Sequence, residues 1–165
     1  MLPSILIFNV HLVHTTHIPD LISSVRYFLA AHQLLAREKG AIRLASIQAR
    51  LLQCLWLRSE SRINHCWNLF GTAARLAYAI GLHRKRHADR IDRIEVECRR
   101  RTFWSAYALD NYLSMALGRP RTFHDDDIDQ ELPSCVDDHQ IHGDHISGGS
   151  THGQSVMLGP VAYAK

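Results

Sequence analysis

The stretch of sequence that decides the fold is residues 71–133. It begins with GTAARLAYAIGLHR (71–84), continues with ECRRRTFWSAYALDNYLSMALGRP (97–120) and ends with DDDIDQELP (125–133). Both of the longer segments are rich in apolar residues and reach a glycine, Gly81 or Gly118. A left-handed glycine commonly ends a helix, and Pro120 does not continue one. The stretch therefore predicts two buried helices followed by an acidic extended segment.

Apolar residues recur at helical spacing outside this stretch as well. Together the patterns predict helices over about residues 19–40, 41–58, 62–80 and 92–117. In the second of these, Leu51 and Cys54 lie on an apolar face, whereas Ser46, Arg50 and Gln53 lie on the opposite, polar face. Gly71 and the alanines of the third predict close approach of another helix. The last half of the fourth is apolar nearly all round, so we expect it to be the most buried element.

We therefore predict an all-α fold, an irregular multi-helix bundle of about four main helices with an extended acidic segment and disordered tails. Residues 1–18 form a poorly defined leader, residues 19–135 the helical domain, and residues 136–165 a Gly-, His- and Ser-rich tail.

Composition favours one ordinary globular domain. The chain has 165 residues, 46% of them hydrophobic and 21% charged, with a net charge of +3. This charge is too small to indicate nucleic acid or an anionic membrane by itself. The apolar start of the chain is shorter than the ~20 residues that span a bilayer, so we expect no membrane association.

The four cysteines are widely spaced and form no CxxC pair, which argues against a zinc or redox motif. We expect Cys54, Cys66 and Cys98 to be small buried apolar residues in a reducing compartment rather than disulfide partners. Two histidine triplets have a spacing of three residues; they are His11, His14 and His17, and His139, His142 and His145. Neither triplet lies in a predicted helix, so we interpret both as solvated tails and predict no cofactor or metal in this chain.

Residues 84–101 carry eight basic and four acidic residues, which raises the hypothesis of a phosphate-binding surface. Glu95 precedes Arg99 by four residues and Glu97 precedes Arg101 by four, the favoured order for helical ion pairs. We therefore favour a salt-bridged helix. The acidic run 125–131 lacks the glycine turn of a calcium loop, so we interpret it as an extended segment in which Ile128 and the following Leu132 dock on the helices, with a weak acidic interaction patch as the alternative.

Asp110 and Arg75 interrupt apolar patterns, and an unpaired buried charge is costly. An ion pair of Arg75 with Asp110 or Glu97 would compensate such buried charges. The alternative is a small helical enzyme that uses Asp110, Arg75 and His83, but no nucleophile or second acid is placed beside them. We therefore predict that the chain is not an enzyme and has no catalytic residues. The helical aromatics are interpreted as core rather than pocket lining; they are Trp67, Phe103, Trp104, Tyr107 and Tyr112.

Several motifs occur in a fixed order: SIQARLLQCLW, W-x-x-x-G-x-A-x-R-x-A-x-x-x-G-L-H-R, E-x-x-R-R-x-F-W-x-x-Y-x-x-D, S-x-x-L-G-R-P and D-I-D-x-x-L-P. Over about residues 25–135 they resemble the fungal-specific transcription factor domain, the regulatory region of zinc-cluster factors such as the xylanolytic activators. The matching residues are Trp67, Gly71, Ala73, Arg75, Ala77, Gly81, Leu82, His83, Arg84, Glu97, Arg100, Arg101, Phe103, Trp104, Tyr107, Asp110, Ser114, Leu117, Gly118, Arg119, Pro120, Asp127, Ile128, Asp129, Leu132 and Pro133.

The resemblance implies an all-helical regulatory domain of a nuclear regulator of RNA polymerase II genes. In the family, DNA and zinc are bound by a separate six-cysteine cluster, which this chain lacks. We therefore expect zinc and DNA only in that missing module, and we expect a fragment, a truncated gene model or a degenerate paralogue.

The partners implied are other proteins, as homodimer or heterodimer, and an unknown small-molecule effector. The alternative function is a truncated interaction module that dimerises with or antagonises a full-length relative. Weak nucleic-acid binding through residues 84–101 is a further hypothesis.

Overall fold

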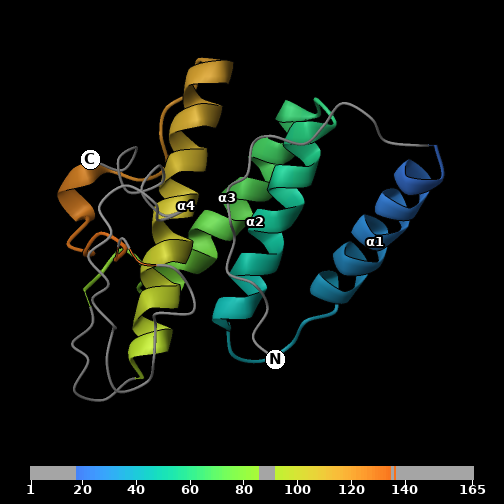
Figure 1. Ribbon diagram of the computed structural model, residues 1–165. Helices are drawn as coiled ribbons and strands as arrows, with labels where there is room; N and C mark the ends of the chain where they lie inside the picture. Colours follow the sequence, from blue (N-terminus) through green and yellow to red (C-terminus); the bar gives the residue numbers. More distant parts are fainter. Residues whose placement is uncertain (1–17, 86–91, 135, 137–165) are drawn as a thin grey trace. The chain divides into compact units, whose positions relative to one another are not determined.

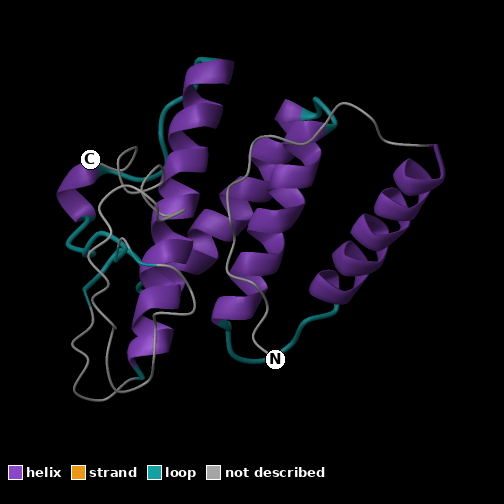
Figure 2. Ribbon diagram, in the orientation of Figure 1, coloured by secondary structure: helices purple, strands orange, loops and turns teal. Residues whose placement is uncertain are grey.

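The computed structural model describes residues 18–85, 92–134 and 136. They fall into two compact units, residues 18–80 and residues 81–136, and each unit is described by itself. Within the described residues the regular structure is helical and there is no strand, which confirms the predicted all-α class (Figure 2). None of the described helices combines the length and apolar character that a bilayer crossing needs.

The first unit consists of α1 (Ile18–Ala36), α2 (Leu44–Ser59) and α3 (Ile63–Ala79) (Figure 1). A tight turn joins α2 to α3, with Ser61 in the left-handed region at φ 57°. The two helices pack side by side and bury the residues predicted for their apolar faces, among them Leu51, Cys54 and Phe70. Cys54 and Cys66 are fully buried free thiols, as expected, whereas Cys98 of the second unit is half-buried.

Part of the predicted polar face of α2 is buried. Ser46 and Gln53 are only 4% and 5% exposed. The amide nitrogen of Gln53 donates to the carbonyl oxygen of Phe28 in α1, 3.4 Å away, and the Phe28 ring stacks on Trp56 at 4.3 Å. The periodicity of α2 identifies its polar face but does not show that α1 covers part of it.

Arg50 of α2 caps the carboxyl end of α1. Its guanidinium donates to the carbonyl oxygen of Leu35 at 3.2 Å and of Ser46 at 2.9 Å, and it pairs with Glu38 at 3.2 Å. Ser46 also donates to the Glu38 carboxylate, and this bond is the largest of the causes that lower the pKa of Glu38. The helix is shorter than predicted, because α1 ends at Ala36 and Gly40, at φ 95°, lies in the loop that follows.

The second unit is built on α4 (Arg93–Leu117), followed by the short 3-10 helix η2 (Asp125–Asp127). The Asp92 side chain accepts from the Ile94 amide at 3.1 Å and so caps the start of α4, as its position predicted. Gly118 ends the helix at φ 62°, also as predicted. The end of α4 is less buried than predicted, because Met115 is 77% exposed.

Gly71 does not provide the close helix approach that the sequence predicted. A Cβ atom there would meet only the terminal nitrogens of Arg75 in its own helix, at 3.6 and 3.9 Å. The small residues Ala73, Ala74 and Ala77 are buried instead. Gly81, by contrast, has φ 65°, which confirms its predicted left-handed conformation.

Candidate functional site

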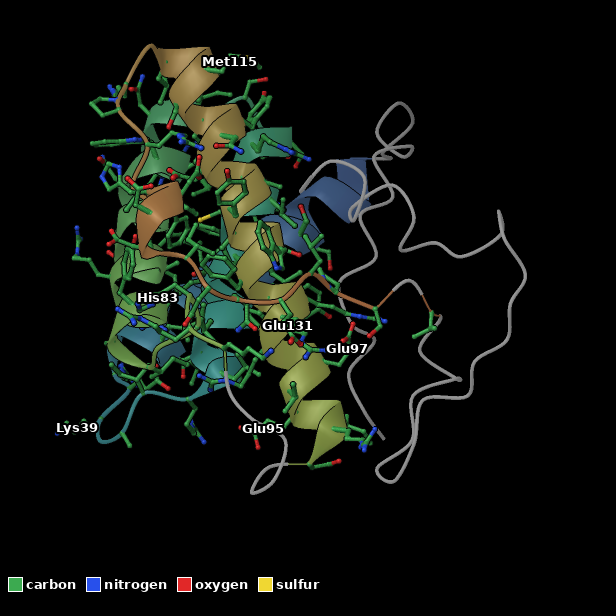
Figure 3. The ribbon with its side chains drawn as sticks, turned by 90° about the vertical axis from the view of Figure 1, so that its left-hand side faces the viewer. Lys39, His83, Glu95, Glu97, Met115 and Glu131 are labelled. Carbon is green, nitrogen blue, oxygen red and sulfur yellow. The ribbon has the colours of Figure 1, made fainter. Side chains whose placement is uncertain are left out.

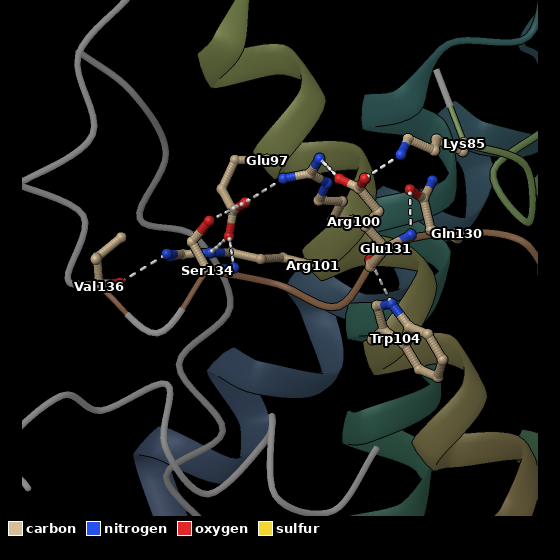
Figure 4. A network of polar contacts seen from close by, with 9 residues as sticks. All are labelled: Lys85, Glu97, Arg100, Arg101, Trp104, Gln130, Glu131, Ser134 and Val136. Carbon is tan, nitrogen blue, oxygen red and sulfur yellow. Dashed lines mark hydrogen bonds and ion pairs between the residues drawn. The ribbon is translucent and has the colours of Figure 1, made fainter. Parts of the chain in front are cut away.

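The candidate site is a polar network that holds residues 128–134, here called the strap, along α4 (Figures 3 and 4). At its centre is Glu97, which is 1% exposed. The Glu97 carboxylate accepts from the Arg101 guanidinium at 2.9 Å and from the amide and hydroxyl of Ser134 at 2.9 and 3.1 Å. Arg101 in turn donates to the carbonyl oxygen of Val136 at 2.7 Å. One buried ion pair on α4 therefore holds the end of the strap.

Glu131 holds the middle of the strap. Its carboxylate pairs with both Arg100 of α4 and Lys85, while its carbonyl oxygen accepts from the Trp104 indole at 2.8 Å. The hydrogen bond from Lys85 is the largest of the causes that lower the pKa of Glu131. Figure 4 shows these side chains pointing at one another from α4, the strap and the segment that follows Gly81.

Gln130 ties the strap to the segment after α3. Its amide nitrogen donates to the carbonyl oxygens of Leu82 and Arg84, at 2.8 and 3.1 Å. The carbonyl oxygen of His83 accepts from the backbone amides of Asp129 and Gln130 at 3.2 and 3.1 Å. The His83 ring is partly buried, and this burial is the main reason that its pKa is lowered. The contacts of His83 with the strap thus use its backbone, while its ring nitrogen Nε2 accepts from the Arg84 guanidinium at 3.2 Å.

Asp110 is buried, and its partners are backbone amides. The carboxylate accepts from Thr122 and Phe123, each at 2.8 Å, and so fixes the loop that follows α4. The Phe123 ring is fully buried and packs edge-on against Phe103 at 5.3 Å. Burial raises the pKa of the Asp110 carboxyl, although the two amides act in the opposite direction. Within its own unit Asp110 thus finds hydrogen-bond donors from the backbone; Arg75 is an exposed residue of α3 in the other unit, and its pairing with Asp110 stays a prediction.

A second, exposed cluster joins α4 to η2. Tyr107 donates to Asp125 at 2.8 Å, and Arg121 pairs with Asp125 at 3.1 Å while its guanidinium lies 5.9 Å from the Tyr107 ring centre. Hydrogen bonds from Arg121 and then Tyr107 lower the pKa of Asp125. The start of the acidic run is therefore a short helical turn, and the extended part begins at Ile128, which is half-buried as its predicted docking requires.

The basic residues of α4 do not form a phosphate-binding face. Arg99 and Arg101 are 5% and 4% exposed, and Arg101 forms its predicted pair with Glu97, whereas Glu95 is exposed. Among the residues that the structure describes, no three His, Cys, Asp or Glu side chains are arranged to hold a metal ion. Both histidine triplets lie outside the described residues.

Most of the family-motif residues between positions 81 and 136 lie around this network. Trp67, Gly71 and Arg75, which also match the family motifs, lie in the other unit. Gly118 and Arg119 form the α4 stop, where the Arg119 amide donates to the carbonyl oxygen of Ser114 at 3.1 Å. Ile128 and Leu132 of the strap are half-buried, and Pro133 is buried. Five residues of the network were not among the residues singled out from sequence; they are Lys85, Gln130, Glu131, Ser134 and Val136. In the network, acidic and basic side chains neutralise one another. The Asp110 carboxylate is occupied by two backbone amides, which gives no support to the alternative that the chain is an enzyme.

Over residues 13–152 the chain matches the model of the fungal specific transcription factor domain, and it belongs to that family. The family is a class of transcription regulator and not a class of enzyme. The motifs that carried the resemblance thus identified the family correctly.

Individual relatives bear names of the same kind. The chain is 38% identical over 117 residues to "Activator of stress genes 1" of Saccharomyces cerevisiae, which covers 70% of this chain and 12% of that protein. It is 40% identical over 91 residues to the "ABC-transporter-regulating transcription factor" of Aspergillus fumigatus, covering 55% of this chain and 10% of that protein. It is 33% identical over 118 residues to the "Uncharacterized transcriptional regulatory protein C3C7.04" of Schizosaccharomyces pombe, covering 72% and 15%.

The chain therefore spans a small part of the length of these relatives. Proteins with such names generally act in the nucleus. No solved structure is significantly similar to this chain.

Proposed function

We propose that this chain is the regulatory, middle-homology domain of a fungal zinc-cluster transcription factor and that it modulates RNA polymerase II transcription in the nucleus. DNA and zinc would be bound by a module that is not part of this chain, and the chain itself would bind no cofactor. Its partners would be other proteins, and a small-molecule effector would bias its conformation.

The observation that carries the proposal is the strap network. Glu97, Arg101 and Ser134 hold one end, and Glu131 with Arg100 and Trp104 holds the middle. Because partly satisfied buried charges are costly, intermediate positions of the strap are disfavoured, and the strap would be either bound, as observed, or released. A ligand or partner that binds one arrangement better shifts the balance toward it and changes which surfaces are exposed.

The experiment is a reporter assay in yeast with the full chain fused to a heterologous DNA-binding domain and an activation segment. Trp104→Phe removes the indole donor to the strap and keeps an aromatic ring, and Arg100→Gln removes one charge that holds Glu131. We expect both variants to change reporter output, whereas the control Arg93→Gln, at an exposed position on the same helix, leaves it unchanged. Equal output from all fusions and from the fusion without the chain would contradict the proposal.

The alternative function, an interaction module that pairs with itself or with a relative, draws on the exposed apolar side chains of α1. Tyr27 and Leu34 lie seven residues apart on one helix face and are 75% and 71% exposed. Light scattering coupled to size exclusion tests this alternative. Dimers of the wild type that dissociate with Tyr27→Ser and Leu34→Gln, but not with Met115→Gln, would favour it, and a monomer at all concentrations would exclude self-association.

A further inference from the structure

Two thiols meet at the centre of the α2–α3 pair. Cys54 of α2 and Cys66 of α3 are both fully buried. The Cys66 thiol donates to the carbonyl oxygen of Cys54 at 3.1 Å, and the Cys54 thiol faces the carbonyl oxygen of Cys66 at 3.8 Å. Each sulfur therefore lies against the backbone of the other residue, and this reciprocal contact brings the two side chains into direct reach.

The two thiols also differ in their readiness to ionise. A hydrogen bond from the Cys54 side chain lowers the pKa of Cys66, whereas the contact with Cys66 and burial raise the pKa of Cys54. The thiolate is the nucleophilic form of cysteine, so attack by Cys66 is the favoured first step, and attack by Cys54 would lead to the same disulfide. Cys54 is then the resolving thiol beside it.

We propose that Cys54 and Cys66 form a reversible redox site in which a small peroxide converts the dithiol to a disulfide that links α2 to α3. The Cys66 thiolate attacks one oxygen of hydrogen peroxide, the O–O bond breaks, and the departing hydroxide takes up a proton to become water. The Cys54 sulfur then attacks the sulfur of the resulting sulfenic acid, so the S–S bond forms, the S–O bond breaks, and the displaced hydroxide leaves with the Cys54 proton as a second water. The dithiol loses two electrons to the peroxide, and an added dithiol reductant returns them.

The disulfide would pin the two helices at the level of their buried face. Because Cys54 and Cys66 are twelve residues apart, the bond closes a short loop and restricts the unfolded chain. We expect oxidation to raise Tm by about 5 °C. Since both sulfurs are buried, formation of the bond depends on transient opening of the helix pair and is slow compared with oxidation of an exposed thiol.

The test uses the full chain with Cys98→Ser and Cys135→Ser, which leaves Cys54 and Cys66 as its only thiols. After treatment with hydrogen peroxide, trypsin cleaves at Arg58 and Arg62 and separates the two cysteines into peptides 51–58 and 63–75. We expect a linked pair of these peptides, lost on reduction, and two free thiols before but none after oxidation. Sulfinic acid on either cysteine without the linked pair would overturn the proposal.

A second arm removes burial as an obstacle. The same variant is unfolded in urea and refolded in a glutathione redox buffer, where thiol–disulfide exchange reaches equilibrium whatever the accessibility in the folded state. We expect the Cys54–Cys66 bond to accumulate and to raise Tm relative to the reduced protein. Mixed disulfides with glutathione, or a bond that lowers Tm, would show that the native geometry does not favour the linkage and would also overturn the proposal. The Cys54→Ser variant is the control and forms no linked pair.

Discussion

Truncation of Glu97 tests whether the buried ion pair holds the strap. In Glu97→Ala, Arg101 keeps its place with a side chain that is 3% exposed but loses its carboxylate partner, and the amide of Ser134 loses its acceptor. Removing one member of a buried pair typically costs about 3–5 kcal/mol, and an unsatisfied buried donor about 1–3 kcal/mol. The two costs are not additive, because the strap can move away in the variant and expose the Ser134 amide to water. We therefore expect a loss of about 4 kcal/mol in the free energy of unfolding.

The assay is urea denaturation followed by far-UV circular dichroism and by tryptophan fluorescence. In a background with Trp56→Phe and Trp67→Phe the fluorescence reports on Trp104, whose indole donates to the strap. A loss of this size is a large part of the about 5–15 kcal/mol that stabilise a typical domain. We therefore expect the midpoint of the Trp104 signal to fall to a much lower urea concentration.

Two further variants separate the ion pair from helix propensity. Glu95→Ala lies two residues earlier on α4, where the side chain is exposed, and should change stability by less than about 0.5 kcal/mol. Glu97→Ala combined with Arg101→Met removes both charges, so most of the loss should be recovered. A Glu97→Ala variant as stable as Glu95→Ala, or a double variant less stable than the single one, would refute the reasoning.

The remaining predictions concern the loop after α4, the middle of the strap and two glycines. Asp110→Ala leaves two buried amides without an acceptor and should cost about 3 kcal/mol in urea denaturation, whereas Asp110→Asn keeps an acceptor and should cost less. Burial raises the pKa of Asp110 above its unfolded value of 3.8. The wild type should therefore lose stability relative to Asp110→Asn as pH rises from 3.8 through the folded pKa. Parallel pH profiles of the free energy of unfolding for the two proteins would contradict this. Glu131→Gln should cost at most about 1 kcal/mol at neutral pH, because Glu131 and Lys85 are well exposed. The difference in stability between wild type and Glu131→Gln should vanish as pH falls below the lowered pKa of Glu131, and it should shrink in high salt. A difference that persists at acid pH would count against the ion pairs. Gly118→Ala should cost about 1–2 kcal/mol of stability because Gly118 has a φ of 62°. Gly71→Ala, within α3, should be neutral or stabilise by about 0.5–1 kcal/mol. Thermal melts that reverse this order would contradict the backbone conformations of the two glycines.

The helices were predictable from sequence because their signals are local. Apolar spacing, the Asp92 cap and the glycine stops at Gly81 and Gly118 each depend on a few neighbouring residues. The Glu97–Arg101 pair was predictable for the same reason, since four residues separate the partners along one helix.

The contacts that hold loops against helices were not predictable. Asp110 is satisfied by backbone amides twelve and thirteen residues away, and every residue type except proline carries such an amide, so no sequence pattern marks them. The same holds for Gln130, which donates to two backbone carbonyls more than forty residues earlier in the chain. Burial of Ser46 and Gln53 on the polar face of α2 also depends on where α1 lies, which periodicity does not specify.

The guanidinium of Arg50 lies at the carboxyl end of α1, a helix whose own last turn has no basic residue. Besides Arg37, which directly follows the helix, a cation that complements the dipole of α1 therefore comes from fifteen residues further along the chain than Leu35. A synthetic peptide that stopped before α2 would lack this charge, and its final turn would fray in water. The smallest excised fragment in which α1 keeps its carboxyl terminus ordered thus has to extend through Arg50.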